Sequence, residues 1–316
     1  MYNNNDSNSH KRFAGGTIFI LFVLMLIGCG SQKGSDGDVG KIAVNGIEIY
    51  HKTVGAGTPT FVLHGGPGDT YETMIQMQSL ADEYKVIFYD QRATGRSTGD
   101  EDTASHTVEQ FVEDLEQLRL KFGGGKVNVI GGSWGSMVAM QYAMKYSDNI
   151  NRMVLMSSMG IRAEYFGHYL TNIEKNRTSE DSLALEKIAE TDGFKNRLPE
   201  TMEKFWRVYF KAYCYNPDLV DSLQLWMRDS TYKQVPGRYA NLGKFMRSYD
   251  IEDDLKKITC PTLILYGDYD PTPVEWVKPI HDNIAGSKMA IIKNAGHWLW
   301  VEAPDRVTGL IREFFK

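Results

Sequence analysis

The distribution of apolar and polar positions predicts a chain in which strands and helices alternate. Short apolar runs typical of buried strands occur at residues 60–63, 85–89, 127–130, 151–156, 261–266 and 289–292. Runs of this kind that end in glycine-rich loops favour a parallel sheet covered on both faces. An Asn-Gly pair at 45–46 between two β-rich segments predicts a hairpin over residues 42–51.

Other segments have the periodicity of helices. Apolar side chains recur at helical spacing over residues 107–122, from a capping box of Thr107 and Gln110 to the glycines at 123–125. Residues 304–315 form a second amphipathic pattern at the end of the chain. The alternation of strands and helices indicates an open α/β sheet with right-handed crossovers.

Residues 161–250 interrupt this alternation. Aromatic and charged residues intermix there, and no run typical of a buried strand appears. We predict an inserted helical cap over this range, which leaves residues 41–160 and 251–316 as the α/β core. Most aromatic residues of a cap pack against one another, but a cap over an active site would place some of them at the pocket.

The first residues predict export. Lys11 and Arg12 precede an apolar run at 18–27, which suits the central region of a signal peptide and is short for a membrane span. We therefore expect residues 1–28 to be a signal peptide of the lipoprotein type. An ordinary cleaved signal or an uncleaved anchor is the alternative.

The end of this run predicts a lipid anchor. The sequence Leu-Ile-Gly-Cys at 26–29 resembles a bacterial lipobox, in which the cysteine is acylated as the signal is removed. Cys29 would then be the lipidated N-terminus, followed by a flexible tether over residues 29–40. Several acyl chains on Cys29 would hold the exported protein at a bacterial cell-envelope membrane, since one chain alone binds only marginally.

Composition, net charge and cysteine content indicate the domain organisation and argue against some binding partners. With 42% hydrophobic and 24% charged residues, the 316-residue chain suits one large α/β domain or a domain with an insertion. A formal net charge of −5 and the lack of a basic stripe argue against nucleic acid. No Cys/His cluster has zinc-ligand spacing, so we expect no metal. Cys214 and Cys260 are expected to be buried free thiols, with a disulfide as the alternative.

Three loops that follow predicted strands carry the candidate chemistry. The segment Gly-Gly-Ser-Trp-Gly at 131–135 fits the G-x-S-x-G nucleophile elbow, which exposes a serine, here Ser133. Asp270 follows the run at 261–266, and His297 follows the last run. Loops at the carboxyl ends of parallel strands converge, and the order Ser, Asp, His is that of the α/β-hydrolases.

Each of these residue types meets a need of carbonyl chemistry. His297 would take the proton of the Ser133 hydroxyl as it attacks, and Asp270 would fix the imidazole tautomer and stabilise the imidazolium. The backbone N–H groups of Gly66 and Trp134 would stabilise the negative charge that develops on the carbonyl oxygen.

Other residues compete for these roles. Asp268 is the alternative acid. Three histidines also lie near plausible loops: His64, His106 and His281. The Gly-His sequence after the last predicted strand favours His297 as the base, and His64 is expected to organise its own loop.

Three segments together resemble the proline iminopeptidases, or prolyl aminopeptidases, of the α/β-hydrolase superfamily. They are His-Gly-Gly-Pro-Gly at 64–68, Asp-Gln-Arg-Ala-Thr-Gly-Arg-Ser at 90–97 and the elbow at 131–135. The resemblance extends from about residue 41 to the end of the chain and is weak through the cap.

This resemblance implies the α/β-hydrolase fold, with a mostly parallel central sheet, helices on both faces and an inserted helical cap. It also implies a serine hydrolase that releases N-terminal proline or small residues from short peptides through an acyl-enzyme, with no cofactor. The resemblance favours Asp270 over Asp268 as the acid. It assigns Asp90 and Arg92 to support of the active-site loops.

The sequence departs from this family where the substrate's free amine is held. Family members that trim peptides use glutamates, one often directly after the catalytic acid and another near the end of the cap. Here Pro271 follows Asp270, and residues 232–248 contain no acidic residue. An ammonium without a carboxylate partner is costly to bury, so selection for a free N-terminus should weaken. Three acidic residues are candidate substitutes: Glu203, Asp229 and Glu275.

Three functions therefore remain open. The first is a membrane-tethered aminopeptidase acting on a small peptide. The second is a carboxylic-ester or amide hydrolase of the same fold without free-amine specificity. A non-catalytic binding protein is the third, and the presence of all three triad residues argues against it.

Overall fold

The computed structural model describes residues 37–99, 103–225 and 240–316. The predicted signal peptide, Cys29, most of the predicted tether and Asp229 lie outside these residues. In the described part, no helix combines the length and apolar character needed to cross a membrane.

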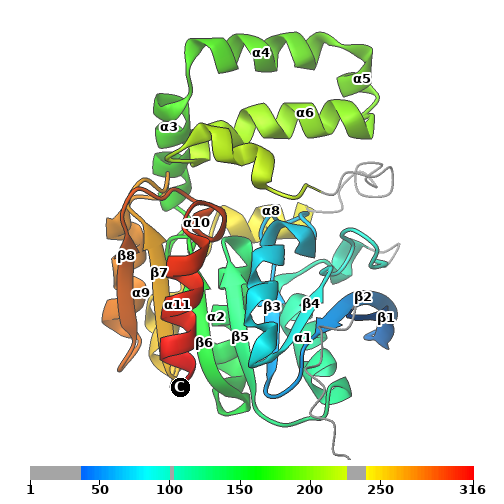
Figure 1. The fold of residues 1–316 in the computed structure, drawn as a ribbon, viewed down its shortest axis with the longest axis vertical. Helices are drawn as coiled ribbons and strands as arrows, with labels where there is room; N and C mark the ends of the chain where they lie inside the picture. The colour runs from blue at the N-terminus through cyan, green and yellow to red at the C-terminus, as the bar shows by residue number, and fades with distance from the viewer. Residues whose placement is uncertain (1–36, 100–102, 226–239) are drawn as a thin grey trace, which may run out of the picture. The chain divides into compact units, whose positions relative to one another are not determined.

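The described residues contain an eight-stranded sheet in the order β1-β2-β4-β3-β5-β6-β7-β8 (Figure 1). Its strands are β1 (Asp38–Val44), β2 (Ile47–Val54), β3 (Pro59–Leu63), β4 (Lys85–Tyr89), β5 (Val127–Gly132), β6 (Ile150–Met156), β7 (Thr262–Gly267) and β8 (Lys288–Ile292). Strand β2 runs antiparallel to both β1 and β4, and the remaining pairs are parallel. The prediction of a mostly parallel sheet is confirmed.

The hairpin at one edge of the sheet turns at Asn45 and Gly46. Both residues have positive φ, 43° and 80°. Two successive positive φ values are what a type I′ turn requires, and its twist matches that of the strands it joins. The predicted hairpin is therefore confirmed, and it fixes the register Val44↔Ile47.

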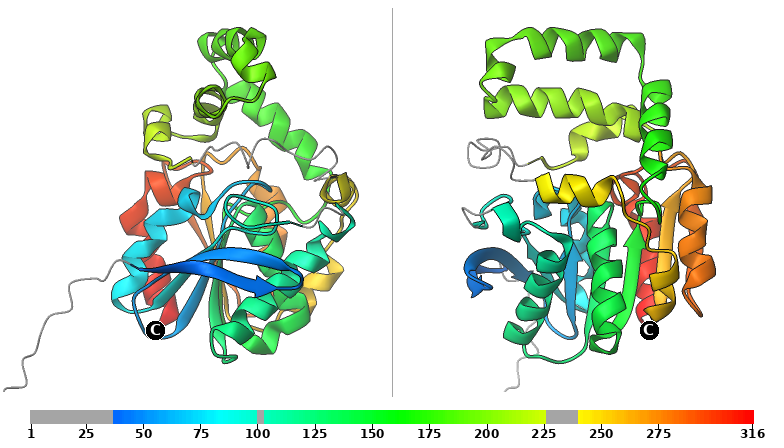
Figure 2. Two further views of the ribbon diagram at one scale, coloured as in Figure 1. Left: turned by 90° about the vertical axis from the view of Figure 1, so that its right-hand side faces the viewer. Right: turned by 180° about the vertical axis from the view of Figure 1, so that it is seen from behind.

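Helices cover both faces of the sheet (Figure 2). One face is covered by helices α1 (Val108–Lys121), α2 (Trp134–Tyr146) and α9 (Val274–Asn283). The other face is covered by η1 (Tyr71–Asp82) and α11 (Pro304–Phe315). Successive strand residues point to opposite faces, so Ile87 belongs to the first core and Val86 and Phe88 to the second. All three are fully buried, as expected for strands covered on both faces.

Helix α1 begins where the capping pattern predicts, but only half of the box forms. The Thr107 Oγ1 atom accepts a hydrogen bond from the Gln110 N–H. The Gln110 side chain donates to Asp114 instead of reaching back to Thr107. The Asp114 carboxylate is a strong acceptor one helical turn further on, and its bond to the Gln110 amide N–H holds that side chain away from the Thr107 N–H.

A helical insertion lies between β6 and β7, as predicted. It comprises α3 (Tyr165–Asn176), α4 (Ser179–Glu190), α5 (Asp192–Lys195), α6 (Pro199–Phe210), η4 (Lys211–Tyr213), η5 (Pro217–Ser222) and α8 (Ala240–Met246). Helices α4 and α6 pack against each other, and α3 connects them to the sheet (Figure 1). A single β-bridge between Arg162 and Asp250 joins the two ends of the insertion.

Short helices complete the described part of the chain. They are η2 (Thr103–Ser105), η3 (Ser147–Asn149), η6 (Asp253–Lys257) and α10 (Leu299–Glu302). Helix α10 directly follows the loop that carries His297.

Candidate active site

Ser133 stands at a sharp turn between β5 and α2. Its φ of 52° and ψ of −120° lie outside the regions that non-glycine residues favour, so the surroundings must hold it there. The Ser133 N–H donates to the Met156 carbonyl at 2.9 Å, and the Ser133 carbonyl accepts from the Ser136 N–H at 2.9 Å. Ser133 is therefore fixed in the strained geometry typical of a nucleophile elbow.

The glycines of this motif allow close approach of backbones. A Cβ atom on Gly135 would collide with the carbonyl oxygen of Leu63, at the end of β3. A Cβ atom on Gly131 would collide with the Gly135 carbonyl. Side chains at these two positions would push α2 away from the sheet, which explains the spacing of the motif.

The structure brings Asp270 and His297 together. The Asp270 Oδ2 atom lies 2.9 Å from His297 Nδ1, and the two side chains are 0% and 5% exposed. Asp270 also accepts the Thr272 N–H at 2.8 Å, which orients the carboxylate. Because a carboxylate only accepts, His297 Nδ1 carries the proton and Nε2 is left as the basic nitrogen.

The backbone of His297 is anchored on both sides. Its N–H donates to the Tyr213 carbonyl at 2.8 Å, and its carbonyl accepts from the Ser157 hydroxyl at 2.6 Å. Tyr213 belongs to the helical insertion and Ser157 follows β6. The position of His297 thus depends on both the sheet and the insertion.

Ser133 and His297 line the same cavity, which has a volume of about 360 Å³. The two side chains make no hydrogen bond to each other within the described residues, as is common before a substrate binds. Aromatic side chains form most of the remaining wall: Phe166, Tyr169, Trp206, Tyr209, Phe210, Tyr213 and Trp298.

Gly66 and Trp134 are the two residues expected to supply backbone donors. Gly66 lines the cavity and has a φ of 111°, which favours glycine. Trp134 is the first residue of α2, so its N–H has no acceptor within the helix and lies at the positive end of the helix dipole. Its indole Nε1–H donates to Gln91 Oε1 at 3.0 Å, which fixes the start of the helix.

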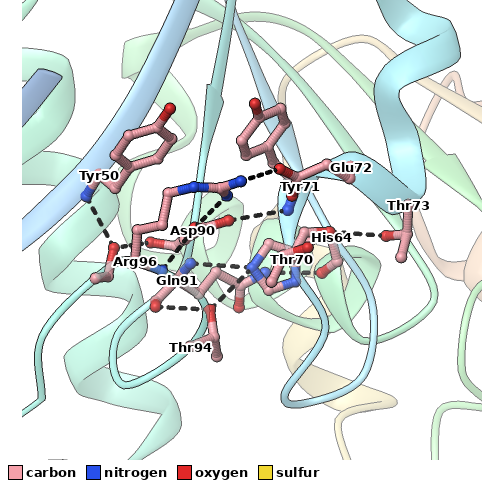
Figure 3. Close-up of polar contacts among 11 residues, drawn as sticks. Tyr50, His64, Thr70, Tyr71, Glu72, Thr73, Asp90, Gln91, Thr94 and Arg96 are labelled. Carbon is pink, nitrogen blue, oxygen red and sulfur yellow. Dashed lines mark hydrogen bonds and ion pairs between the residues drawn. The ribbon is translucent and has the colours of Figure 1, made fainter. Parts of the chain in front are cut away.

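His64 is buried and lies beside Gln91 and Thr94 (Figure 3). Its Nε2 atom accepts the Gln91 N–H at 3.0 Å, so its Nδ1 atom must be the donor to the Gly65 carbonyl at 2.9 Å. Burial lowers the pKa of His64 to about 4. The structure therefore places a neutral His64 between the loops after β3 and β4.

Asp90 joins the same two loops (Figure 3). Its carboxylate accepts the Tyr71 N–H at 3.1 Å and the Arg96 N–H at 2.9 Å. Burial raises the pKa of Asp90 to about 6, although these two backbone bonds act in the opposite direction. The Arg96 guanidinium contacts both Asp90 and Glu72.

Arg92 connects the loop after β4 to α1. Its guanidinium donates to both oxygens of Asp114 at 2.8 Å, and both side chains are almost completely buried. The same guanidinium donates to the Asn45 carbonyl in the hairpin. Arg92 does not line the cavity, so its contacts fix loops and not a ligand.

The competing residues lie elsewhere. Asp268 is exposed and accepts the Asn294 N–H at 2.8 Å, so it bonds its own loop. His281 lies on α9 beside Ser287, and His106 is buried beside Gly99.

The described candidates for an amine-binding carboxylate do not line the cavity. Glu203 forms an ion pair with Arg207 along α6 at 2.7 Å. Glu275 is exposed in the first turn of α9.

One acidic residue at the cavity was not predicted from the sequence. Asp69 directly follows the His-Gly-Gly-Pro-Gly segment and lines the cavity with Ser133 and His297. Burial raises the pKa of Asp69 to about 6, and the nearby His297 acts in the opposite direction. Its position immediately after a loop beside the nucleophile is the signal that could have found it.

Two further observations concern sulfur and metal chemistry. Cys214 and Cys260 are both free and buried, and burial raises the pKa of Cys214 to about 12. The described ranges contain no group of three or more His, Cys, Asp or Glu side chains placed to hold a metal ion.

Comparisons with known proteins agree with this fold. The family model described as alpha/beta hydrolase fold matches residues 59–304. A proline iminopeptidase of Saccharolobus solfataricus is 29% identical over 280 residues, which cover 85% of this chain and 89% of the relative. A proline iminopeptidase of Lactobacillus acidophilus is 29% identical over 294 residues, covering 87% and 97%.

Solved structures show the same likeness. The proline iminopeptidase of Mycobacterium smegmatis matches with a TM-score of 0.65 at 19% identity, over 88% of this chain and 97% of the other. A thermophilic esterase from Thermogutta terrifontis matches with a TM-score of 0.63 at 26% identity, over the same shares of the two chains. The chain therefore belongs to the α/β-hydrolase family, and it is a hydrolase similar in sequence to the proline iminopeptidases.

Proposed function

We propose that the protein is a serine hydrolase with Ser133 as nucleophile, His297 as general base and Asp270 as the supporting acid. The observation that carries this proposal is the buried Asp270–His297 hydrogen bond at the cavity that Ser133 also lines. The bond leaves His297 Nε2 free to accept the Ser133 proton.

The proposed reaction proceeds through an acyl-enzyme. Ser133 Oγ attacks the substrate carbonyl while His297 takes its proton, and the N–H groups of Gly66 and Trp134 stabilise the oxyanion. His297 then gives this proton to the leaving amine as the scissile bond breaks. Water, deprotonated by His297, attacks the acyl-enzyme and releases the carboxylic acid and Ser133.

We propose further that the substrates are short peptides with N-terminal proline or another small residue. The relatives named proline iminopeptidase support this choice, since the likeness covers most of both chains. A cavity of about 360 Å³ with aromatic walls suits a compact apolar ring beside the scissile carbonyl.

Replacing the nucleophile tests this proposal. Ser133→Ala should lower kcat by about 10³-fold or more, because the remaining groups cannot form an acyl-enzyme. The control is Ser248→Ala, which removes an exposed hydroxyl that donates to the Lys244 carbonyl in α8. The assay uses prolyl and alanyl 4-nitroanilides, and wild-type rates in Ser133→Ala would refute the assignment.

A carboxylic-ester hydrolase is the second candidate. It is favoured by the absence of any glutamate among the described residues that line the cavity. The same assay decides between the two, with N-acetylated anilides and short acyl esters added to the panel. Turnover of esters without turnover of aminoacyl anilides would establish the second candidate and exclude the first.

We also propose that Cys29 is lipidated and tethers the protein to a bacterial cell-envelope membrane. The lipobox-like sequence at 26–29 supports this proposal. Cys29→Ala should move the protein from the membrane fraction to the soluble fraction. Identical fractionation of the two proteins would refute the anchor.

A further inference from the structure

Asp69 is a carboxylate in the cavity wall that the proposed reaction does not use. Among the described residues that line the cavity, it is the single acid, and none is a lysine or an arginine. Its carboxylate makes no hydrogen bond or ion pair within the described part of the chain. Partial burial of an unpaired carboxylate costs free energy. A bound ligand of opposite charge would offset this cost.

The geometry places Asp69 close to the nucleophile. A Cβ atom built on Gly65 would lie 3.3 Å from Asp69 Oδ2 and also 3.3 Å from Ser133 Cβ. The two atoms are therefore separated by at most twice that distance. A negative charge this near to Ser133 opposes formation of the oxyanion, unless a positive charge neutralises it.

The rest of the cavity fits a cation. The rings of Tyr169, Tyr209 and Tyr213 line it together with other aromatic side chains. The faces of aromatic rings carry partial negative charge and attract ammonium groups, more strongly where water is excluded. One carboxylate in a cavity lined by such rings can form a site for a single positive charge.

We propose that Asp69 and these aromatic rings bind a positively charged nitrogen of the substrate beside the scissile carbonyl. This inference rests on the proposed function, because it places the cation relative to the carbonyl that Ser133 attacks. Asp69 then replaces the glutamates that the sequence lacks at their expected positions. The substrate's own charge cancels the repulsion between Asp69 and the oxyanion, so neutral substrates are disfavoured twice.

The site should depend on pH in a defined direction. Asp69 lines the cavity together with His297 and three tyrosines, Tyr169, Tyr209 and Tyr213. The pKa of Asp69 is raised to about 6, so ionisation near this pH creates the binding site. Burial raises the pKa values of Tyr169 and Tyr213 well above the ordinary range, so these phenols stay neutral. Preference for a cationic substrate should therefore increase as the pH rises through about 6.

A matched pair of substrates tests this inference. L-Prolyl 4-nitroanilide and cyclopentanecarbonyl 4-nitroanilide differ by an NH₂⁺ group in place of a CH₂ group. Wild-type protein should prefer the prolyl compound in kcat/KM by about tenfold to 100-fold at pH 7. Asp69→Asn should reduce this ratio at least tenfold and remove its pH dependence, with a higher rate on the neutral compound. The control is Asp253→Asn, which removes an exposed carboxylate on η6.

Two further measurements separate this inference from the proposed function. The corresponding methyl esters give the same ratio if the protein cleaves esters and not anilides. Calorimetric titration of wild-type and Asp69→Asn with prolinamide and cyclopentanecarboxamide measures the cation site without turnover. Tighter binding of prolinamide that is lost in Asp69→Asn supports the inference even if no compound is cleaved. Equal affinity of wild-type protein for the two amides, or an unchanged ratio in Asp69→Asn, overturns it.

Discussion

At the scale of single residues, the cavity contains groups whose conformation or charge is costly to the fold. Ser133 adopts a φ of 52°, a conformation that costs a non-glycine residue about 1–3 kcal/mol. Asp69 holds a carboxylate without a hydrogen-bond partner within the described residues. Both features serve the proposed chemistry, which accounts for their presence despite the cost in stability. The strained backbone exposes the Ser133 hydroxyl, and the Asp69 carboxylate is available to bind a cation.

The cost of Asp69 predicts a stability effect with a defined sign. Its pKa is raised from 3.8 to about 6 in the folded protein, so the folded state binds more protons than the unfolded state between these values. The contribution of protonated Asp69 to stability is thus fully present below about pH 4 and is lost as the pH rises through about 6. Asp69→Asn should raise the free energy of unfolding by about 1–3 kcal/mol at pH 7.

Urea unfolding of wild-type protein and Asp69→Asn at pH 4, 5, 6 and 7 measures this difference. The difference should be near zero at pH 4 and should grow toward pH 7. A variant that is less stable than wild-type protein at pH 7 would show that the Asp69 carboxylate has a stabilising partner. A difference that is constant across the pH range would rule out its titration as the cause.

At the scale of elements, apolar periodicity predicts the structure well where one pattern dominates. Helix α11 spans Pro304–Phe315, the range that its amphipathic pattern predicts, and β4 spans the predicted residues 85–89. The pattern fails for η1, where the 3₁₀ conformation and a non-helical Met74 disturb the 3.6-residue period. No helix was predicted over the range of α9, which contains Pro279 inside the helix.

The pairing of strands could not be predicted in the same way. Periodicity shows that a strand is buried on both faces, but it does not name the neighbouring strand. Strand β2 pairs antiparallel with β4, and β3 lies between β4 and β5 in the sheet. These contacts join residues that are distant in sequence, so the local pattern of apolar residues does not predict them.

In the candidate site, too, local sequence predicts some residues, whereas others depend on contacts between distant segments. Ser133, Asp270 and His297 could be placed at one edge of the sheet because each sits in a loop directly after a strand. The aromatic wall of the cavity could not be assigned, since it depends on how the insertion folds over that edge. Asp69 was missed because a lone acid after a glycine-rich loop has no motif, and its meaning appears only from its place in the cavity.

At the scale of the described molecule, the helical insertion is held against the loop that carries His297 by a group of close contacts, which we call the joint. Gly296 lies against the η4 segment, where a Cβ atom would collide with the Tyr213 carbonyl oxygen and lie 3.0 Å from Cys214 Cα. The adjacent His297 N–H donates to that same carbonyl. Glu302 of α10 reinforces the joint, because its carboxylate accepts both the Gly296 N–H and the Asn216 N–H.

This joint predicts that a single methyl group on Gly296, a residue that does not line the cavity, impairs the enzyme. Gly296→Ala should separate η4 from the loop, lengthen the His297–Tyr213 hydrogen bond and shift the imidazole relative to Ser133. Displacements of about 1 Å cost up to about 100-fold in rate, so kcat should fall by roughly 10-fold to 100-fold. Overpacking should also lower the free energy of unfolding by about 1–3 kcal/mol.

The matched control is Gly309→Ala in α11, where an added Cβ atom meets nothing within 4 Å. This variant should keep the wild-type rate and gain about 0.5–1 kcal/mol of stability, because alanine favours a helix interior over glycine. Steady-state kinetics and urea unfolding of the three proteins measure both quantities. If Gly296→Ala loses stability but keeps wild-type kcat, the insertion is attached to the His297 loop without positioning the imidazole. A fall in kcat confined to Gly296→Ala would instead show that the insertion contributes to catalysis. The insertion would then position the base His297 and also supply part of the cavity wall.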